Sequence, residues 1–136
     1  MRKKTSSVAT LQRDKLELTV EIVTMTTPEI KEDKLYKLLR HGSIDKFNTL
    51  RQQGEECDLR YADLRSVDLR QINAKGLDMS NCYLRQADLR GVDFSETRLE
   101  GVSISGAKIS GALFPSELSA EEINLSLQHG TRMRYR

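Results

Sequence analysis

Apolar residues recur every five positions through the middle of this chain. From Cys57 to Ser116 the sequence divides without a gap into twelve units of five residues, and the third residue of each unit, its centre, is apolar in all twelve. The first residue is apolar in eleven units, with Thr97 as the exception. A period of five fits neither a helix, which repeats at about 3.6 residues, nor the alternation of a strand. We therefore expect a chain that turns a corner in every unit and points two side chains per unit into a shared core.

The positions on either side of each centre are mostly polar or charged. Aspartate often precedes a centre and arginine often follows one, as in the unit ADLRG at residues 87–91. Five of the eight glycines occupy the fifth position of a unit. Glycine is the least strained residue where the backbone needs a positive φ. The fifth position is therefore the predicted corner.

The run of units resembles the A-[DN]-L-x-x pattern of the pentapeptide repeat proteins over 60 of the 136 residues. The resemblance implies an all-β solenoid core, a right-handed quadrilateral β-helix with four units per coil and about three coils over residues 57–116. Stacking every twenty residues would place Ala74 beneath Phe94. We interpret the small Ala74 as compensation for a large neighbour in a close-packed interior. That interior is expected to be filled, so no cofactor is predicted.

The sequence before the repeats is suited to covering the strand edges that such a stack exposes. Residues 25–56 are predicted to form an N-terminal α-helical cap. Thr27-Pro28-Glu29 has the features of a helix start, and Ser43 can cap a second helix that ends near Gly54. The predicted apolar stripe of the first helix consists of Ile30, Leu35, Leu38 and Leu39.

The sequence after the repeats predicts a second cap. Residues 117–136 are expected to form a capping helix and a basic tail, frayed or lying along the helix. The helix opens at Ser119 with the capping-box signature SAEE. It is expected to close at His129-Gly130 and to cover coil three around Phe114.

The first 24 residues are a separate question. Residues 15–24 alternate like a strand, yet Met25 lies just before the predicted helix start. We interpret residues 1–24 as an N-terminal extension, flexible or not native, with Met25 and not Met1 as the natural start. The alternative is a strand that extends one edge of the solenoid.

Charge and hydropathy exclude several classes of protein. The net charge is +2, from 22 basic and 20 acidic side chains, and residues 57–116 carry eight of each. A nucleic-acid binder usually has a basic face and a DNA mimic needs an acidic one, so direct nucleic-acid binding is not expected. No apolar run approaches the roughly 18 residues of a membrane span, and the N-terminus lacks a signal-peptide core. Together with two cysteines expected to be reduced, this predicts a cytoplasmic protein without membrane contact.

Few residues are candidates for catalysis or metal binding. Cys57 and Cys82 both occupy inward first positions and are interpreted as buried free thiols, without the nearby histidines of a zinc site. His41 and His129 each precede a glycine at a predicted helix end, where a histidine can interact favourably with the last carbonyls of the helix. The sequence therefore predicts no catalytic, metal or cofactor-binding residue, and no enzyme.

The outward aspartates and arginines form the one organised exterior feature. A candidate partner-binding surface consists of Arg65, Asp68, Arg70, Tyr83, Arg85, Asp88 and Arg90. Arginine and tyrosine are favoured at interfaces. The competing interpretation, which we favour, is a solvated set of ion pairs that keeps the protein soluble and contributes little energy.

Two functions follow as hypotheses. The first is a small bacterial adaptor or scaffold, a monomer or weak homodimer that binds an unidentified protein. The second comes from the resemblance, since some pentapeptide repeat proteins mimic a DNA duplex and bind or protect DNA gyrase or topoisomerase. Those proteins are long, acidic and dimeric rods. This chain differs in its three coils, its neutral repeat surface and its C-terminal helix.

Overall fold

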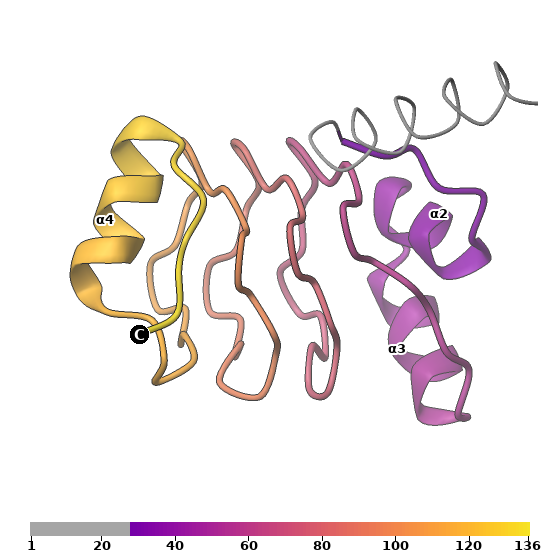
Figure 1. Cartoon of the computed structure of the whole chain (residues 1–136). Coiled ribbons are helices and arrows are strands. Elements are labelled where there is room, and N and C mark those ends of the chain that lie inside the picture. The colour runs from indigo at the N-terminus through magenta and orange to yellow at the C-terminus, as the bar shows by residue number, and fades with distance from the viewer. Residues whose placement is uncertain (1–27) are drawn as a thin grey trace, which may run out of the picture.

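The computed structural model describes residues 28–136, in which a stack of coils lies between helices at both ends (Figure 1). Six parallel bridges join residues that are twenty positions apart, so four units make one coil. At one of them Leu64 N–H donates to the Tyr83 carbonyl and Tyr83 N–H donates to the Ala62 carbonyl, each at 3.0 Å. Coil one comprises residues 57–76, coil two 77–96 and coil three 97–116. The interpretation of residues 1–24 as an extension, the start at Met25 and the alternative strand at 15–24 all concern residues outside those described.

Neighbouring coils pair through single residues and not through regular strands. Residues 28–136 contain isolated bridges but no strand or sheet, so the regular strands of an all-β core are not seen. The fifth residue of a unit has a positive φ in ten of the twelve units, which leaves too few extended residues between corners for a longer ladder. Glycine occupies half of these corners. The other five corners are Tyr61, Ser66, Gln71, Asn81 and Gln86.

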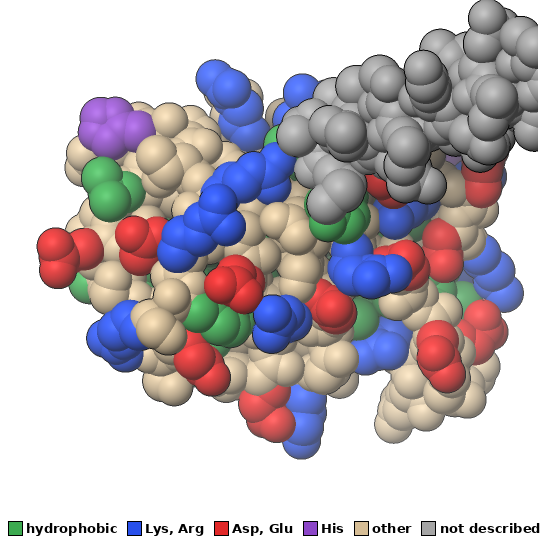
Figure 2. Space-filling model, in the orientation of Figure 1, with side chains coloured by type: hydrophobic (Ala, Val, Ile, Leu, Met, Phe, Trp, Pro, Cys, Tyr) green, Lys and Arg blue, Asp and Glu red, His purple; other side chains and the backbone are tan. Residues whose placement is uncertain are grey.

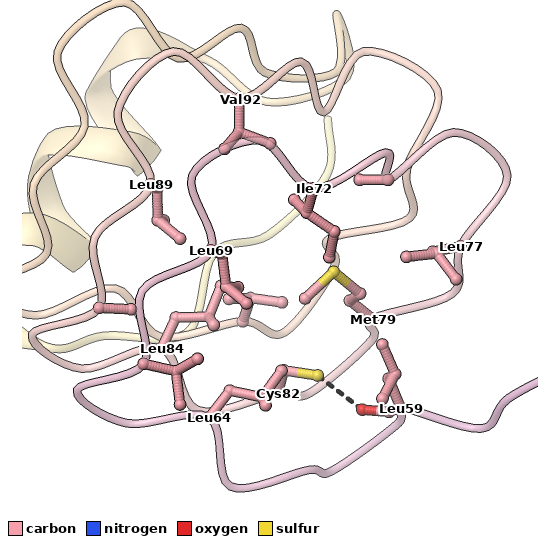
Figure 3. Close-up of a cluster of buried hydrophobic side chains, with 14 of the residues drawn as sticks. Leu59, Leu64, Leu69, Ile72, Leu77, Met79, Cys82, Leu84, Leu89 and Val92 are labelled. Atoms are coloured by element: carbon pink, nitrogen blue, oxygen red, sulfur yellow. Dashed lines mark hydrogen bonds between the residues drawn. The ribbon is translucent and has the colours of Figure 1, made fainter. Parts of the chain in front are cut away.

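The first and third residues of the units fill the interior, as predicted (Figure 3). Four of these positions, in the first unit and the last two units of the stack, are only half-buried, namely Cys57, Ile109, Ala112 and Phe114. Thr97, the polar exception, is buried and donates its hydroxyl to the Ala74 carbonyl at 2.7 Å. Burial of one large aliphatic side chain stabilises a fold by about 1.5–3 kcal/mol. The repeated pattern therefore supplies the main stabilisation of the stack.

Two helices, α2 (Lys34–Arg40) and α3 (Ile44–Gln52), form a hairpin at the coil-one end (Figure 1). Asp33 begins α2, because its carboxylate accepts from the N–H groups of Leu35 and Tyr36 at 2.8 and 3.1 Å. Ser43 is the N-cap residue of α3, as predicted, although its side chain makes no capping hydrogen bond.

The predicted helix start at Thr27-Pro28-Glu29 is wrong. Glu29 N–H donates to the Tyr61 carbonyl, and the Glu29 carbonyl accepts from Asp63 N–H, both at 2.8 Å. This extended segment covers one side of coil one, where a helix would leave two backbone groups of the coil unpaired. Ile30 does not join the apolar stripe and is 73% exposed.

The side chain of Asn48 covers a second side of coil one. Its Nδ2 donates to the Gln71 carbonyl and its Oδ1 accepts from Asn73 N–H, each at 2.9 Å. These are the same two kinds of bond that the backbone of Glu29 makes with Tyr61 and Asp63. One primary amide on α3 thus substitutes for a missing coil residue.

Helix α4 (Ala120–His129) lies at the coil-three end (Figure 1). Ser119 Oγ accepts from Glu122 N–H at 3.1 Å, which is one half of the predicted capping box. The other half is absent, because Glu122 Oε1 accepts from Arg134 N–H at 2.8 Å. The tail, residues 131–136, is not frayed: Met133 is fully buried and its N–H donates to the Val102 carbonyl at 2.9 Å.

We expect Asn48→Asp to lower the free energy of unfolding by about 1–2 kcal/mol, since a carboxylate cannot donate to the Gln71 carbonyl and would face it instead. Urea denaturation at pH 7 measures the loss. Gln52→Glu provides the matched control, because Gln52 is exposed on the same helix. Equal effects of the two substitutions would show that Asn48 does not stabilise coil one.

Candidate interaction surfaces

Four of the arginines that follow a centre are held by the aspartate two residues before them. We call each such aspartate–arginine pair a clamp. The arginine Nε and Nη2 donate to the two carboxylate oxygens, and the arginine backbone N–H donates to one of them. In the clamp on Asp88 the two side-chain bonds are 2.9 and 2.7 Å long. Paired bonds of this kind are geometrically specific as well as strong. The clamps are Asp58–Arg60, Asp63–Arg65, Asp68–Arg70 and Asp88–Arg90.

These clamps contain most of the predicted partner-binding surface. Its clamped members are Arg65, Asp68, Arg70, Asp88 and Arg90. Arg70 Nε also lies 3.4 Å from Asp88 Oδ2, which links coils one and two. On the face shown in Figure 2, positive and negative side chains are interspersed. The balanced charge of the repeats therefore reflects ion pairs between residues that lie close together.

The clamped carboxylates have low pKa values. The hydrogen bonds from the Arg90 side chain, supported by the Arg90 backbone N–H and the charge of Arg70, lower the pKa of Asp88 to about 2. The pKa of Asp63 is lowered in the same way, first by its hydrogen bond from Arg65. Such carboxylates remain ionised near neutral pH and are poor holders of a catalytic proton.

Tyr83 and Arg85, the other two residues of the predicted surface, lie outside the clamps. The guanidinium of Arg132 lies 5.1 Å from the centre of the Tyr83 ring, and its Nη2 donates to Tyr83 Oη. Tyr83 therefore holds the tail against coil two. The side chain of Arg85 is exposed and makes no hydrogen bond or ion pair with any residue of the described chain, although its backbone carbonyl accepts from Ser66 N–H.

Arg85 borders an open hollow of about 390 Å³. We call it the arginine hollow, and its lining consists of Arg40, Asp63, Arg65, Ser66, Arg85 and Gln86. Arg40 comes from α2, and its Nη1 donates to the Arg65 carbonyl at 2.8 Å. The sequence pattern identified Arg65 and Arg85 but missed Arg40, because only the folded hairpin brings α2 beside coil one.

Helix α4 covers the backbone edge of coil three only in part. Ser126 Oγ accepts from Ile104 N–H at 3.0 Å, and the tail continues this cover. The N–H groups of Ile109, Gly111 and Phe114 have no hydrogen-bond partner among residues 28–136. The cover predicted around Phe114 is thus incomplete.

An apolar side chain lies beside these unpaired groups. Leu113 is 57% exposed, and together with the N–H groups of Ile109, Gly111 and Phe114 it defines the coil-three rim. Leu113 occupies the second position of its unit, which is aspartate in six other units. An apolar residue at an outward position was the sequence signal that could have indicated this surface.

The remaining candidates have ordinary structural surroundings. Burial raises the pKa of the Cys57 thiol to about 11 and that of Cys82 to about 12. Cys82 is fully buried and bonds the Leu59 carbonyl (Figure 3), whereas Cys57 is only half-buried. His41 and His129 lie at the C-terminal ends of α2 and α4, as predicted.

The described residues hold neither a metal-binding cluster nor a membrane-spanning helix. Among residues 28–136, no group of three or more His, Cys, Asp and Glu side chains is placed to hold a metal ion. The described helices are also too short or too polar for any of them to cross a bilayer.

Comparison with known proteins gives one match. The family model for pentapeptide repeats matches residues 78–114 with eight copies of the repeat. No curated protein and no solved structure matches the chain.

The clamp on Asp88 predicts a measurable pH dependence. We expect Arg90→Gln to raise the pKa of Asp88 from about 2 towards its ordinary value of 3.8, as measured by carboxyl ¹³C NMR titration. Because the folded-state pKa is the lower one, the clamp stabilises the fold above about pH 4, and this contribution is lost as the pH falls towards 2. Arg85→Gln should leave the pKa of Asp88 unchanged. An unchanged value in Arg90→Gln would contradict the clamp.

Proposed function

Because this chain is a pentapeptide repeat protein, we propose that it is a small, non-enzymatic cytoplasmic scaffold that binds another protein, with its coils wound as the right-handed, four-sided β-helix of that family. Parallel bridges at intervals of twenty residues and a corner in most units support this winding. A stack of this kind is rigid, since every coil is pinned to its neighbours on several sides. Rigidity suits a scaffold because little conformational entropy is lost when a partner binds.

The observation that carries the proposal is the coil-three rim. Unpaired backbone groups at an edge are a template for a further extended chain, and leaving such a group buried without a partner costs about 1–3 kcal/mol. At the coil-one end the protein fills the equivalent places itself, with the backbone of Glu29 and the amide of Asn48. The proposed partner does the same at coil three with an extended segment, whose carbonyls accept from Ile109 and Phe114 and whose apolar side chain packs on Leu113.

The titratable groups support a role without catalysis. General acids and bases work best with a pKa near the working pH. The clamps lower the pKa of Asp63 and Asp88, and burial raises that of Cys57 and Cys82, so each of these groups is moved away from neutrality. Free, unpaired thiols also suit the reducing cytoplasm.

The alternative, a DNA mimic that binds or protects gyrase or topoisomerase, has weaker support. A mimic of the phosphate backbone needs rows of unpaired negative charge. In this chain all three aspartates of coil one, and Asp88 of coil two, are clamped by arginine, which cancels their charge locally. Protection of gyrase from a quinolone by stoichiometric protein in a supercoiling assay would favour the alternative.

A photo-crosslinking amino acid at position 113 tests the proposed docking surface. We expect it to capture a reproducible partner in cells of the source organism, because Leu113 lies within the rim. The control is the same amino acid at position 30, since Ile30 is even more exposed and belongs to the opposite end of the stack. Equal capture from both positions would contradict docking at the rim.

The purified partner then allows a quantitative test. Leu113→Lys should weaken its binding about tenfold or more, whereas Ile30→Lys should not change it. Hydrogen exchange by NMR should show new protection of the Ile109, Gly111 and Phe114 amides in the complex. Binding that survives Leu113→Lys without such protection would overturn the proposal.

A further inference from the structure

The arginine hollow departs from the charge pairing found elsewhere on the repeats. Five arginines follow a centre directly, and four of them have an aspartate two residues earlier. Arg85 is the exception, because Tyr83 stands where its clamp partner would be. The Tyr83 ring and hydroxyl both contact the guanidinium of Arg132 in the tail. The Arg85 guanidinium therefore has no bond from its N–H groups to any of residues 28–136.

Two further guanidiniums are held in place at the same hollow. Arg65 is fixed by Asp63, whose two carboxylate oxygens each accept at 2.8 Å, and its Nη1 makes no bond within residues 28–136. Arg40 is anchored through Nη1 by the Arg65 carbonyl at 2.8 Å and, more weakly, by the Asp63 carbonyl at 3.5 Å. Their anchored positions mean that little side-chain entropy remains to be lost on binding.

The charges at the hollow do not cancel. Three arginines and one aspartate line it, so the local charge is +2. The carboxylate of Asp63 is already engaged by Arg65, and its pKa is lowered by that bond. The side chains of Ser66 and Gln86 add neutral donors at the adjoining corner. A doubly negative, compact group with several acceptor oxygens would satisfy this arrangement.

We propose that the arginine hollow binds the phosphoryl group of a phosphate monoester, with Arg85 as its principal ligand and Arg40 and Arg65 as supporting ligands. Near neutral pH such a group carries a charge close to −2 and three acceptor oxygens, which matches the charge and donors of the lining. Arginine pairs with phosphate through two parallel N–H bonds. A hollow of about 390 Å³ has room for more than the phosphoryl group, so the ester belongs to a larger molecule. This site lies on the side of coils one and two and does not depend on docking at the coil-three rim.

Titration with inorganic phosphate, followed by NMR, tests the site directly. Ionic strength is held constant with sodium chloride, and the arginine Nε–Hε signals are observed together with the backbone amides. We expect saturable shifts at Arg85, Arg65, Ser66 and Gln86. Equal, unsaturated shifts at all arginines, including Arg60 and Arg90, would indicate screening alone and would overturn the proposal.

Substitutions separate Arg85 from the general charge of the protein. Arg85→Gln should weaken phosphate binding about tenfold or more. Arg90→Gln removes the same charge from a clamped position on the neighbouring side and should have little effect. Similar losses in both variants would contradict a specific site.

Position 83 offers a test that keeps Arg85 in place. Tyr83→Asp recreates the Asp-x-Arg sequence and should draw Arg85 into a clamp, thereby weakening phosphate binding. Tyr83→Ser also removes the ring and its contact with Arg132 but supplies no carboxylate, so binding should be retained. Equal affinities of these two variants would argue against an available Arg85 as the principal ligand.

Two phosphate esters distinguish the source of the ligand. Glycerol phosphate represents small molecules, and a phosphoserine peptide represents a modified protein. Tighter binding of either one than of inorganic phosphate supports the proposed monoester site and identifies the source. If the peptide with glutamate in place of phosphoserine binds as well as the phosphopeptide, the phosphoryl assignment is wrong.

Discussion

The pairing of backbone groups at the edges of the coils is the constraint on which the rest of the structure depends. Each coil contacts the next through single bridging residues, so every coil has backbone N–H and carbonyl groups directed along the stack. Between coils these groups satisfy one another. At the ends they need substitutes, because an unpaired group removed from water is costly. The protein uses an extended segment at Glu29, an amide at Asn48 and a hydroxyl at Ser126 for this purpose.

The core and the surface make unequal contributions to stability. A buried aliphatic side chain contributes about 1.5–3 kcal/mol, whereas an exposed ion pair contributes about 0–1 kcal/mol. With most first and third positions buried, the core dominates the energy of the fold. The clamps have a different role: they fix each arginine against its own coil and cancel its charge. The clamps therefore determine where the charged groups lie more than they add to stability.

The periodic part of the fold could be predicted from the sequence, and the ends could not. The period of five predicted which residues are inside, because burial depends on a pattern repeated in every unit. The helix start at Pro28 was wrong, since local capping signals say nothing of the distant groups on Tyr61 and Asp63 that recruit Glu29. The corners at the fifth position were also predicted, and the repeated stack holds even a residue such as Gln71 there at positive φ against its local preference.

Only part of the candidate site could be predicted, because only part of it follows the repeat pattern. Arg65 and Arg85 follow the pattern and were found, although their unequal pairing was not recognised. Arg40 belongs to a helix whose position over coil one depends on long-range contacts. No spacing in the sequence connects residue 40 with residues 65 and 85.

Departures from the repeat are informative because every unit meets the same structural demands. At the second position of a unit, several replacements for aspartate have a structural partner: Arg98 bonds Glu100, and Ser103 donates to the Gly130 carbonyl. Leu113 has no such compensation and exposes apolar area. Tyr83 is compensated by Arg132, but its presence leaves Arg85 without a carboxylate. The fold alone does not require either consequence, so the rim and the hollow are the places where binding is the better explanation.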